Sequence, residues 1–98
     1  MRVTWSLRAL RELRDQRRYI ARTQPAAAAR IAARIVSATD RLETYPRYGR
    51  AASWDETGQL RELAVAGTPF LVLYIVDDAA AMVLIVRVVH GAQLRGSE

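Results

Sequence analysis

The sequence contains no cysteine and no lysine, and it has a single histidine among its 98 residues. Without cysteine, disulfide bonds, zinc–thiolate sites and cysteine nucleophiles are excluded. One histidine is too few to anchor a metal cluster, so we expect neither a metal nor another cofactor. The phosphate-binding pattern G-x-x-x-x-G-K-[ST] and the dinucleotide-binding pattern G-x-G-x-x-G are also absent. The usual motifs of nucleotide-dependent and metal-dependent enzymes are therefore missing.

Long apolar runs are missing as well. The longest apolar stretch lies near Phe70 to Val76, far short of the roughly 20 residues that a membrane-spanning helix needs. The segment Met1–Leu13 carries charges throughout and has no apolar core typical of a secretory signal peptide. We therefore expect no membrane partner and a cytoplasmic location, which the lack of cysteine fits.

Arginine is present in excess. All fifteen basic residues are arginines, and the formal net charge is +5. Residues 1–50 hold twelve arginines and four acids, whereas residues 51–98 hold three arginines and six acids, so the halves carry +8 and −3. Arginine suits bidentate contacts to phosphate or carboxylate, although a GC-rich genome explains the same composition. The basic surface is expected on the first half of the chain.

Hydrophobic periodicity predicts a strand and two helices in the first half. Val3 and Trp5 alternate with polar residues in a short strand, Arg2–Trp5, and Ser6 is a good N-cap for a helix from about Leu7 to Arg22. A second helix is predicted to begin at Pro25 and to end at Tyr45-Pro46. Its apolar seam repeats at spacings of three and four residues and comprises Ala28, Ile31, Ile35, Ala38 and Leu42. The two helices are expected to form an antiparallel hairpin.

Three strands are predicted in the second half, after a polar loop. They span Leu60–Ala66, Phe70–Val76 and Met82–Val89, with turn residues between them and a short polar tail from Gly91 to Glu98.

The predicted fold class is α+β, with the order β-α-α-β-β-β in one domain, residues 1–98. The N-terminal helical hairpin would pack on one face of a small, mainly antiparallel twisted sheet. Apolar residues left exposed on the other face would form an interaction surface.

The order of several short motifs resembles the RelE/ParE superfamily of toxins from type II toxin–antitoxin systems. The motifs are Trp5–Leu13 (W-S-x-x-A-L-R-E-L), Tyr19-Ile20, Leu42–Arg50 (L-E-T-Y-P-R-Y-G-R), Leu60–Leu63, Gly67–Phe70, Leu73–Val76 and Val86–Gln93. The resemblance implies a cognate antitoxin that wraps the toxin in a hetero-oligomer and contacts operator DNA, so that the toxin reaches DNA only through its partner. It also implies one of two targets, since RelE-like toxins cut mRNA on the ribosome and ParE-like toxins poison DNA gyrase.

Metal-free RNA cleavage needs an acid, a base and cations around the scissile phosphate. The candidates for these roles are Arg61, Arg87 and His90. An arginine that RelE-like toxins often carry is replaced by Leu71, and no tyrosine follows His90. On a regular strand Arg87 would share a face with Val83, Ile85 and Val89, whereas His90 would share the other face with Leu84, Val86 and Val88. The two side chains would then not meet at one phosphate unless a bulge at His90-Gly91 redirects the histidine. These features favour a ParE-like toxin that inhibits DNA gyrase without a catalytic site of its own.

Seven residues are candidates for target or partner binding, namely Arg47, Arg50, Arg61, Arg87, His90, Gln93 and Arg95. Structural roles compete at several of them. His90 could bond to backbone, Arg61-Glu62 could pair across strands, Arg87 could be a buried ion-pair partner, and Arg47 and Arg50 could be solvated.

Two other functions stay open. One is a ribosome-dependent endoribonuclease, in which Arg61 and Arg87 stabilise the phosphate and His90 is the acid or base. The other is a toxin-derived module without activity that only binds antitoxin. In every case the basic helices predict that the antitoxin's binding segment carries acids beside apolar anchors.

Overall fold

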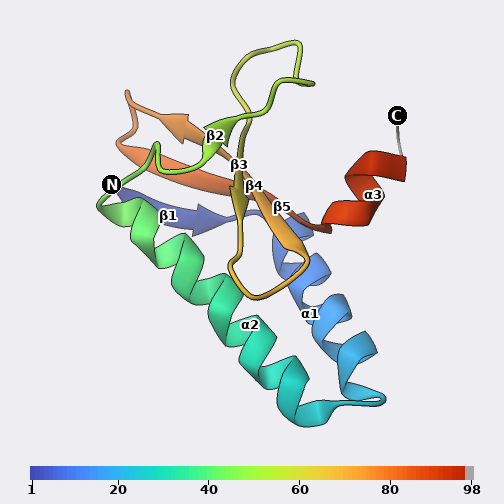
Figure 1. Ribbon diagram of the computed structural model, residues 1–98. Helices are drawn as coiled ribbons and strands as arrows, with labels where there is room; N and C mark the ends of the chain where they lie inside the picture. The colour runs from blue at the N-terminus through green and yellow to red at the C-terminus, as the bar shows by residue number, and fades with distance from the viewer. Residues whose placement is uncertain (97–98) are drawn as a thin grey trace.

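A helical hairpin lies across one face of a five-stranded sheet (Figure 1). The computed structural model of the protein describes residues 1–96. The elements in chain order are β1 (Arg2–Trp5), α1 (Leu7–Ala21), α2 (Pro25–Asp40), the 3₁₀ helix η1 (Arg41–Glu43), β2 (Arg50–Ala51), β3 (Arg61–Ala64), β4 (Phe70–Asp77), β5 (Met82–His90) and α3 (Gly91–Gly96). The predicted α+β class and the helical hairpin on one face of the sheet are confirmed.

The sheet has the strand order β1-β5-β4-β3-β2. Strand β1 runs parallel to β5, and the other neighbouring pairs are antiparallel. Two short elements were not predicted from the sequence. Strand β2 has only two residues, too few to show a periodic pattern, and α3 lies in the segment expected to be a polar tail. No helix within the described residues is long and apolar enough to cross a bilayer.

The helix boundaries follow the predicted signals, with one difference. The Ser6 side chain accepts a hydrogen bond from the Ala9 N–H at 3.0 Å, which caps α1, and Pro25 opens α2. Helix α2 ends at Asp40, before the predicted Tyr45-Pro46 pair. The Thr39 hydroxyl donates to the Val36 carbonyl at 2.8 Å, a bond that competes with regular helix geometry, and the chain continues as the tighter helix η1.

The predicted seam of α2 packs into the core. Ala28, Ile35 and Leu42 are buried, and Ile31 and Ala38 are partly buried against the same cluster. From the sheet, β4 contributes its alternate residues Phe70, Val72 and Tyr74. These positions define the helix-covered face of the sheet, so every residue paired with them across a strand stands on that face too.

Tyr74 is fully buried and joins the sheet to the loop before β2. Its hydroxyl accepts a hydrogen bond from the Gly49 N–H at 2.9 Å. A Cβ at position 49 would lie 2.7 Å from the Glu62 carbonyl oxygen and 2.8 Å from the Tyr74 hydroxyl. Only glycine permits the backbone to approach this closely.

We therefore expect Gly49→Ala to lower the free energy of unfolding by about 1–3 kcal/mol, because the added methyl group displaces the loop or the ring. Urea denaturation followed by circular dichroism measures the change. Gly58→Ala is the control for space, since no heavy atom lies within 4 Å of its Cβ position, although its φ of +72° adds some strain of its own. A stability of Gly49→Ala equal to that of the native chain would contradict this packing.

Candidate functional site

The three candidate catalytic residues do not share a face of the sheet. Arg61 is paired with Tyr74 and His90 with Phe70, so both stand on the helix-covered face, although beside the middle and the first residue of β4. Arg87 is paired with Leu73 and stands on the other face. A single phosphate cannot contact all three side chains in this arrangement.

A β-bulge changes part of the predicted strand parity. The register of β4 and β5 shifts between Leu73 and Tyr74, which are paired with Arg87 and Ile85. The extra residue, Val86, reverses the alternation of side chains along β5. The prediction that Arg87 shares a face with Val83 and Ile85 is therefore wrong, as is the grouping of Leu84 with His90. The prediction that Arg87 and His90 lie on opposite faces is confirmed.

Arg87 is held by Glu12 of α1. Its guanidinium donates to Glu12 Oε2 through Nη2 at 2.8 Å and through Nε at 3.2 Å, and Glu12 Oε1 accepts from the Val88 N–H at 3.1 Å. Strand β1 ends opposite Ile85, so the edge of β5 beyond this residue has no neighbouring strand. At that edge Glu12 accepts the backbone N–H bond that a strand would otherwise accept. Because this carboxylate binds its guanidinium, Arg87 has a structural role. Such a role was one of the alternatives predicted from the sequence.

Arg61 is also engaged with the protein itself. Its guanidinium donates to the Gly49 carbonyl at 2.6 and 3.1 Å and to the Arg47 carbonyl at 3.2 Å. These bonds fix the loop that leads into β2. In the cross-strand charge pairing predicted at Arg61-Glu62, Arg61 therefore takes no part, because its guanidinium bonds to backbone carbonyls.

Glu62 does form a charge pair across strands, with Arg50 of β2 at 2.8 Å, and it accepts a bond from the Trp54 indole N–H at 3.3 Å. The Glu62 side chain is 8% exposed, whereas that of Arg50 is 81% exposed. Arg47 forms an ion pair with Asp78 at the β4–β5 turn. Both arginines thus anchor the loop and still present one side to solvent.

His90 caps the C-terminal helix. Its Nδ1 accepts the Ala92 N–H at 3.1 Å, and its own backbone N–H donates to Gln93 Oε1 at 2.9 Å. The imidazole packs edge-on against Phe70, with ring centroids 5.6 Å apart. This reciprocal pair resembles a capping box with histidine at the N-cap, which explains why α3 forms. The side chain of Arg95 lies outside the described residues.

Asp55 organises the loop between β2 and β3. Its carboxylate accepts bonds from the Thr57 hydroxyl and from the N–H groups of Leu60, Gln59 and Thr57. These bonds favour the ionised form and lower the pKa of Asp55 below its ordinary value of 3.8, the Thr57 hydroxyl having the largest effect.

A carboxylate whose pKa is lowered in the folded state stabilises the fold at pH values above its unfolded-state pKa. This stabilisation is lost as the pH falls through its folded-state pKa. We expect the midpoint of the pH-dependent shift of the Leu60 amide signal to lie below 3.8. A pH titration followed by NMR measures this midpoint. A midpoint at or above the ordinary value would contradict the loop geometry.

The most exposed large apolar side chains lie on the helices and in the loops and not on the sheet, which corrects the prediction of an apolar interaction face there. On the face of the sheet that the two helices do not cover, Leu73 and Val89 are buried, and Leu71, Ile75 and Leu84 are partly buried. On the outer side of the hairpin Leu10 is 49% exposed and Val36 is 41% exposed.

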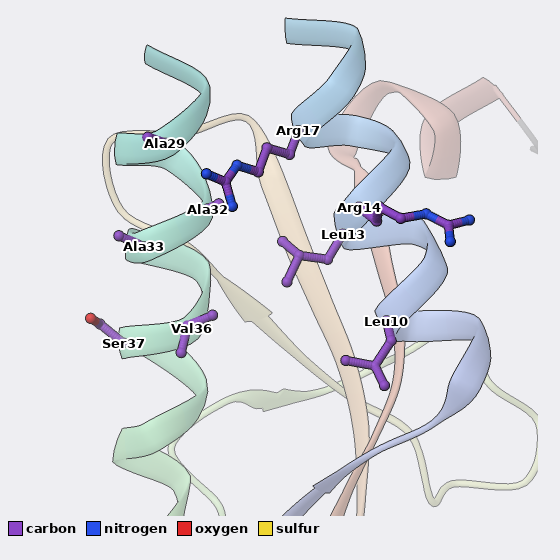
Figure 2. Close-up of a pocket in the computed structure, with 9 residues that line it drawn as sticks. All are labelled: Leu10, Leu13, Arg14, Arg17, Ala29, Ala32, Ala33, Val36 and Ser37. Carbon is purple, nitrogen blue, oxygen red and sulfur yellow. The ribbon is translucent and has the colours of Figure 1, made fainter. Parts of the chain in front are cut away.

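Leu10 and Val36 line a groove of about 600 Å³ between α1 and α2. Its other lining residues are Leu13, Arg14, Arg17, Ala29, Ala32, Ala33 and Ser37. Figure 2 shows Leu10, Leu13 and Val36 directed into the groove and Arg17 reaching across it toward α2. The alanines of α2 make the groove, because small side chains leave the space between the helices open. The sequence signal was present, since Leu10 stands beside the buried stripe of α1.

The comparison with protein families decides what kind of molecule carries these surfaces. The family described as "ParE toxin of type II toxin-antitoxin system, parDE" matches residues 3–95. The chain belongs to the ParE toxin family.

Similar proteins agree with this membership. Toxin RelE2 of Caulobacter vibrioides is 44% identical over 92 residues, covering 94% of this chain and 97% of that protein. Putative toxin Y4kP of Sinorhizobium fredii is 44% identical over 73 residues, covering 74% of this chain and 73% of that protein.

Two solved structures share the fold of this ParE-family chain. The chromosomal ParDE system of P. aeruginosa superposes with a TM-score of 0.78 at 20% identity, covering 92% of this chain and 95% of that one. The toxin–antitoxin complex RelBE2 of Mycobacterium tuberculosis gives 0.68 at 27% identity, covering 91% and 95%. The ParE-family toxin thus combines an exposed helical groove with a sheet whose candidate catalytic residues are engaged in the fold.

Proposed function

We propose that this toxin inhibits DNA gyrase by binding it, without breaking a bond of its own, and that a cognate antitoxin neutralises it. The arrangement of Arg87 and His90 supports the proposal most. They lie on opposite faces of β5, Arg87 is neutralised by Glu12, and the Nδ1 of His90 is used to cap α3. An acid–base pair needs groups that reach one substrate atom together, and these two do not.

The groove between α1 and α2 is the proposed antitoxin site. An amphipathic helix laid in such a groove buries its apolar side chains there, where Leu10 and Val36 would contact them. Arg17, which reaches across the groove, would face an acid on the same segment. The solved neighbours described as toxin–antitoxin systems support a partner of this kind.

Ribosome-dependent mRNA cleavage is the competing function, and the name of the relative Toxin RelE2 favours it. In that case Arg61 and Arg87 would have to leave their present partners, the Gly49 carbonyl and the Glu12 carboxylate, to reach a phosphate. Each departure would leave a partly buried polar group without its bond, which costs about 1–3 kcal/mol.

Expression of the chain without its antitoxin separates the candidates. We expect growth arrest accompanied by a DNA-damage response, and primer extension on translated mRNA should show no codon-phased cuts. Codon-phased cuts in arrested cells would replace the proposal with the endoribonuclease. Normal growth with correctly folded protein would identify a module that only binds antitoxin.

A further inference from the structure

The outer surface of α1, opposite the side chains that enter the core, carries a row of exposed arginines. At 3.6 residues per turn, four of them fall within about 80° of one another around the helix. They are Arg11, Arg14, Arg18 and Arg22. We call this set the α1 arginine stripe. It extends over about 17 Å, at a rise of 1.5 Å per residue.

Little of the charge of the stripe is neutralised within the chain. Among the described residues its one ion pair joins Arg14 to the neighbouring Asp15 at 3.4 Å. Both side chains are more than half exposed, so this pair contributes little. The other acid of α1, Glu12, is bound to Arg87 at the sheet. The stripe therefore presents nearly its whole positive charge to solvent.

Such an arrangement is unfavourable for the helix by itself. Arg14, Arg18 and Arg22 follow one another at a spacing of four residues, where like charges face each other and destabilise a helix. A surface that serves only solubility mixes charges of both signs. A stripe of one sign attracts a polyanion instead, and the bound polyanion relieves the repulsion between the arginines.

An exposed aromatic side chain stands beside the stripe. Tyr19 is 68% exposed, more than any other large apolar or aromatic side chain within residues 1–96. The guanidinium carbon of Arg22 lies 5.9 Å from the centre of its ring. This cation–π contact holds the guanidinium in place and leaves its N–H groups free. The tyrosine hydroxyl is itself a donor that nucleic-acid-binding proteins use toward phosphate.

We infer that the α1 arginine stripe binds the phosphate backbone of duplex DNA without reading its sequence. Arginine bonds to phosphate oxygens through two parallel N–H groups. A duplex carries one negative charge per about 1.7 Å of its axis, so a stripe of about 17 Å meets a continuous row of phosphates.

Two other polyanions fit the stripe less well. The apolar face of α1 is buried in the core, so it cannot enter a lipid surface as a membrane-binding amphipathic helix does. A protein partner needs apolar anchors, and the α1–α2 groove offers these whereas the stripe does not.

This contact differs from the operator binding that the family resemblance implies, which runs through the antitoxin. It also goes beyond the proposed function, because neither gyrase nor antitoxin is needed for it. In the cell it would keep the free toxin close to the DNA on which gyrase acts.

The test adds the full chain to a fluorescently labelled DNA duplex and follows the anisotropy at several salt concentrations. Four phosphate contacts predict a slope of log K against log salt concentration of about −3.6, and Arg18→Ala/Arg22→Ala should reduce it to about −1.8. At about 50 mM salt the affinity of this variant should be at least about tenfold lower. Circular dichroism checks that it is folded, as expected since alanine is the best helix former.

The matched control is Arg30→Ala/Arg41→Ala, which removes the same charge from the other side of the hairpin. Both arginines line a groove between α2 and β3. This variant should keep the native slope and bind within about threefold of the native chain, because the slope counts only the phosphates that are contacted.

NMR locates the contact without a variant. When the duplex is added, the side-chain Nε–H signals of Arg11, Arg18 and Arg22 should shift, and those of Arg30 and Arg41 should not. The inference is overturned if the native chain does not bind the duplex or if the two double variants lose affinity equally. It is also overturned if single-stranded RNA or polyglutamate of equal charge binds more tightly than the duplex. No gyrase or antitoxin is present, so these outcomes are independent of the proposed function.

Discussion

Replacing Leu10 with glutamate is expected to weaken antitoxin binding by about 30- to 700-fold, since a central residue of an interface contributes about 2–4 kcal/mol and each 1.4 kcal/mol is tenfold. Leu10 is directed into the α1–α2 groove and is half exposed, so the fold tolerates the change whereas an apolar partner does not. A carboxylate placed there would lose its hydration against the apolar side chains of the partner.

Leu7→Glu is the matched control. Leu7 lies on the same helix and is 61% exposed, but it does not line the groove. Calorimetry with the purified cognate antitoxin should show an affinity within about threefold of the native one, as for surface positions away from a hot spot. If both variants weaken binding equally, the antitoxin covers α1 generally. If Leu10→Glu does not weaken binding, the groove is not part of the interface.

Replacing Glu12 with alanine is expected to lower the free energy of unfolding by about 2–4 kcal/mol and the melting temperature by about 10–20 °C. The change removes the partner of Arg87 and of the Val88 N–H at once. The Glu12 and Arg87 side chains are only 21% and 34% exposed, so water replaces these bonds poorly. Differential scanning calorimetry measures the loss.

The double variant Glu12→Leu/Arg87→Leu is the control for this prediction. Replacing a partly buried ion pair by apolar residues of similar size is often neutral, so part of the stability should return, although the Val88 N–H stays without Glu12. A Glu12→Ala variant as stable as the native chain would show that Arg87 does not depend on Glu12. The Arg87 guanidinium would then be available to bind a phosphate.

The fold could be predicted where a local signal marks each boundary. Ser6 and Pro25 begin helices, and Asp77-Asp78 separates two strands. The bulge at Val86 could not be predicted, because a continuous apolar strand gives no sign of where an extra residue is inserted. For the same reason the predicted faces of Val83 and Ile85 relative to Arg87 were wrong.

The candidate binding residues were recognised as chemically notable, but their partners were not. Arg47, Arg50, Arg61 and Arg87 all bond to groups distant in the sequence, and only the tertiary structure brings these together. Arginines of the basic first half pair with Asp78 and Glu62 of the acidic second half. The charge asymmetry read from the sequence thus partly cancels within the loop and sheet, while the helix arginines remain on the surface.

We propose that this ParE-family toxin acts by binding gyrase. A supercoiling assay with purified gyrase tests it most directly, with the toxin titrated alone and again after saturation with its antitoxin. The account predicts loss of supercoiling or trapped cleaved DNA with the toxin alone, and normal supercoiling when the antitoxin is present. Undiminished supercoiling at a large excess of folded toxin would contradict the claim.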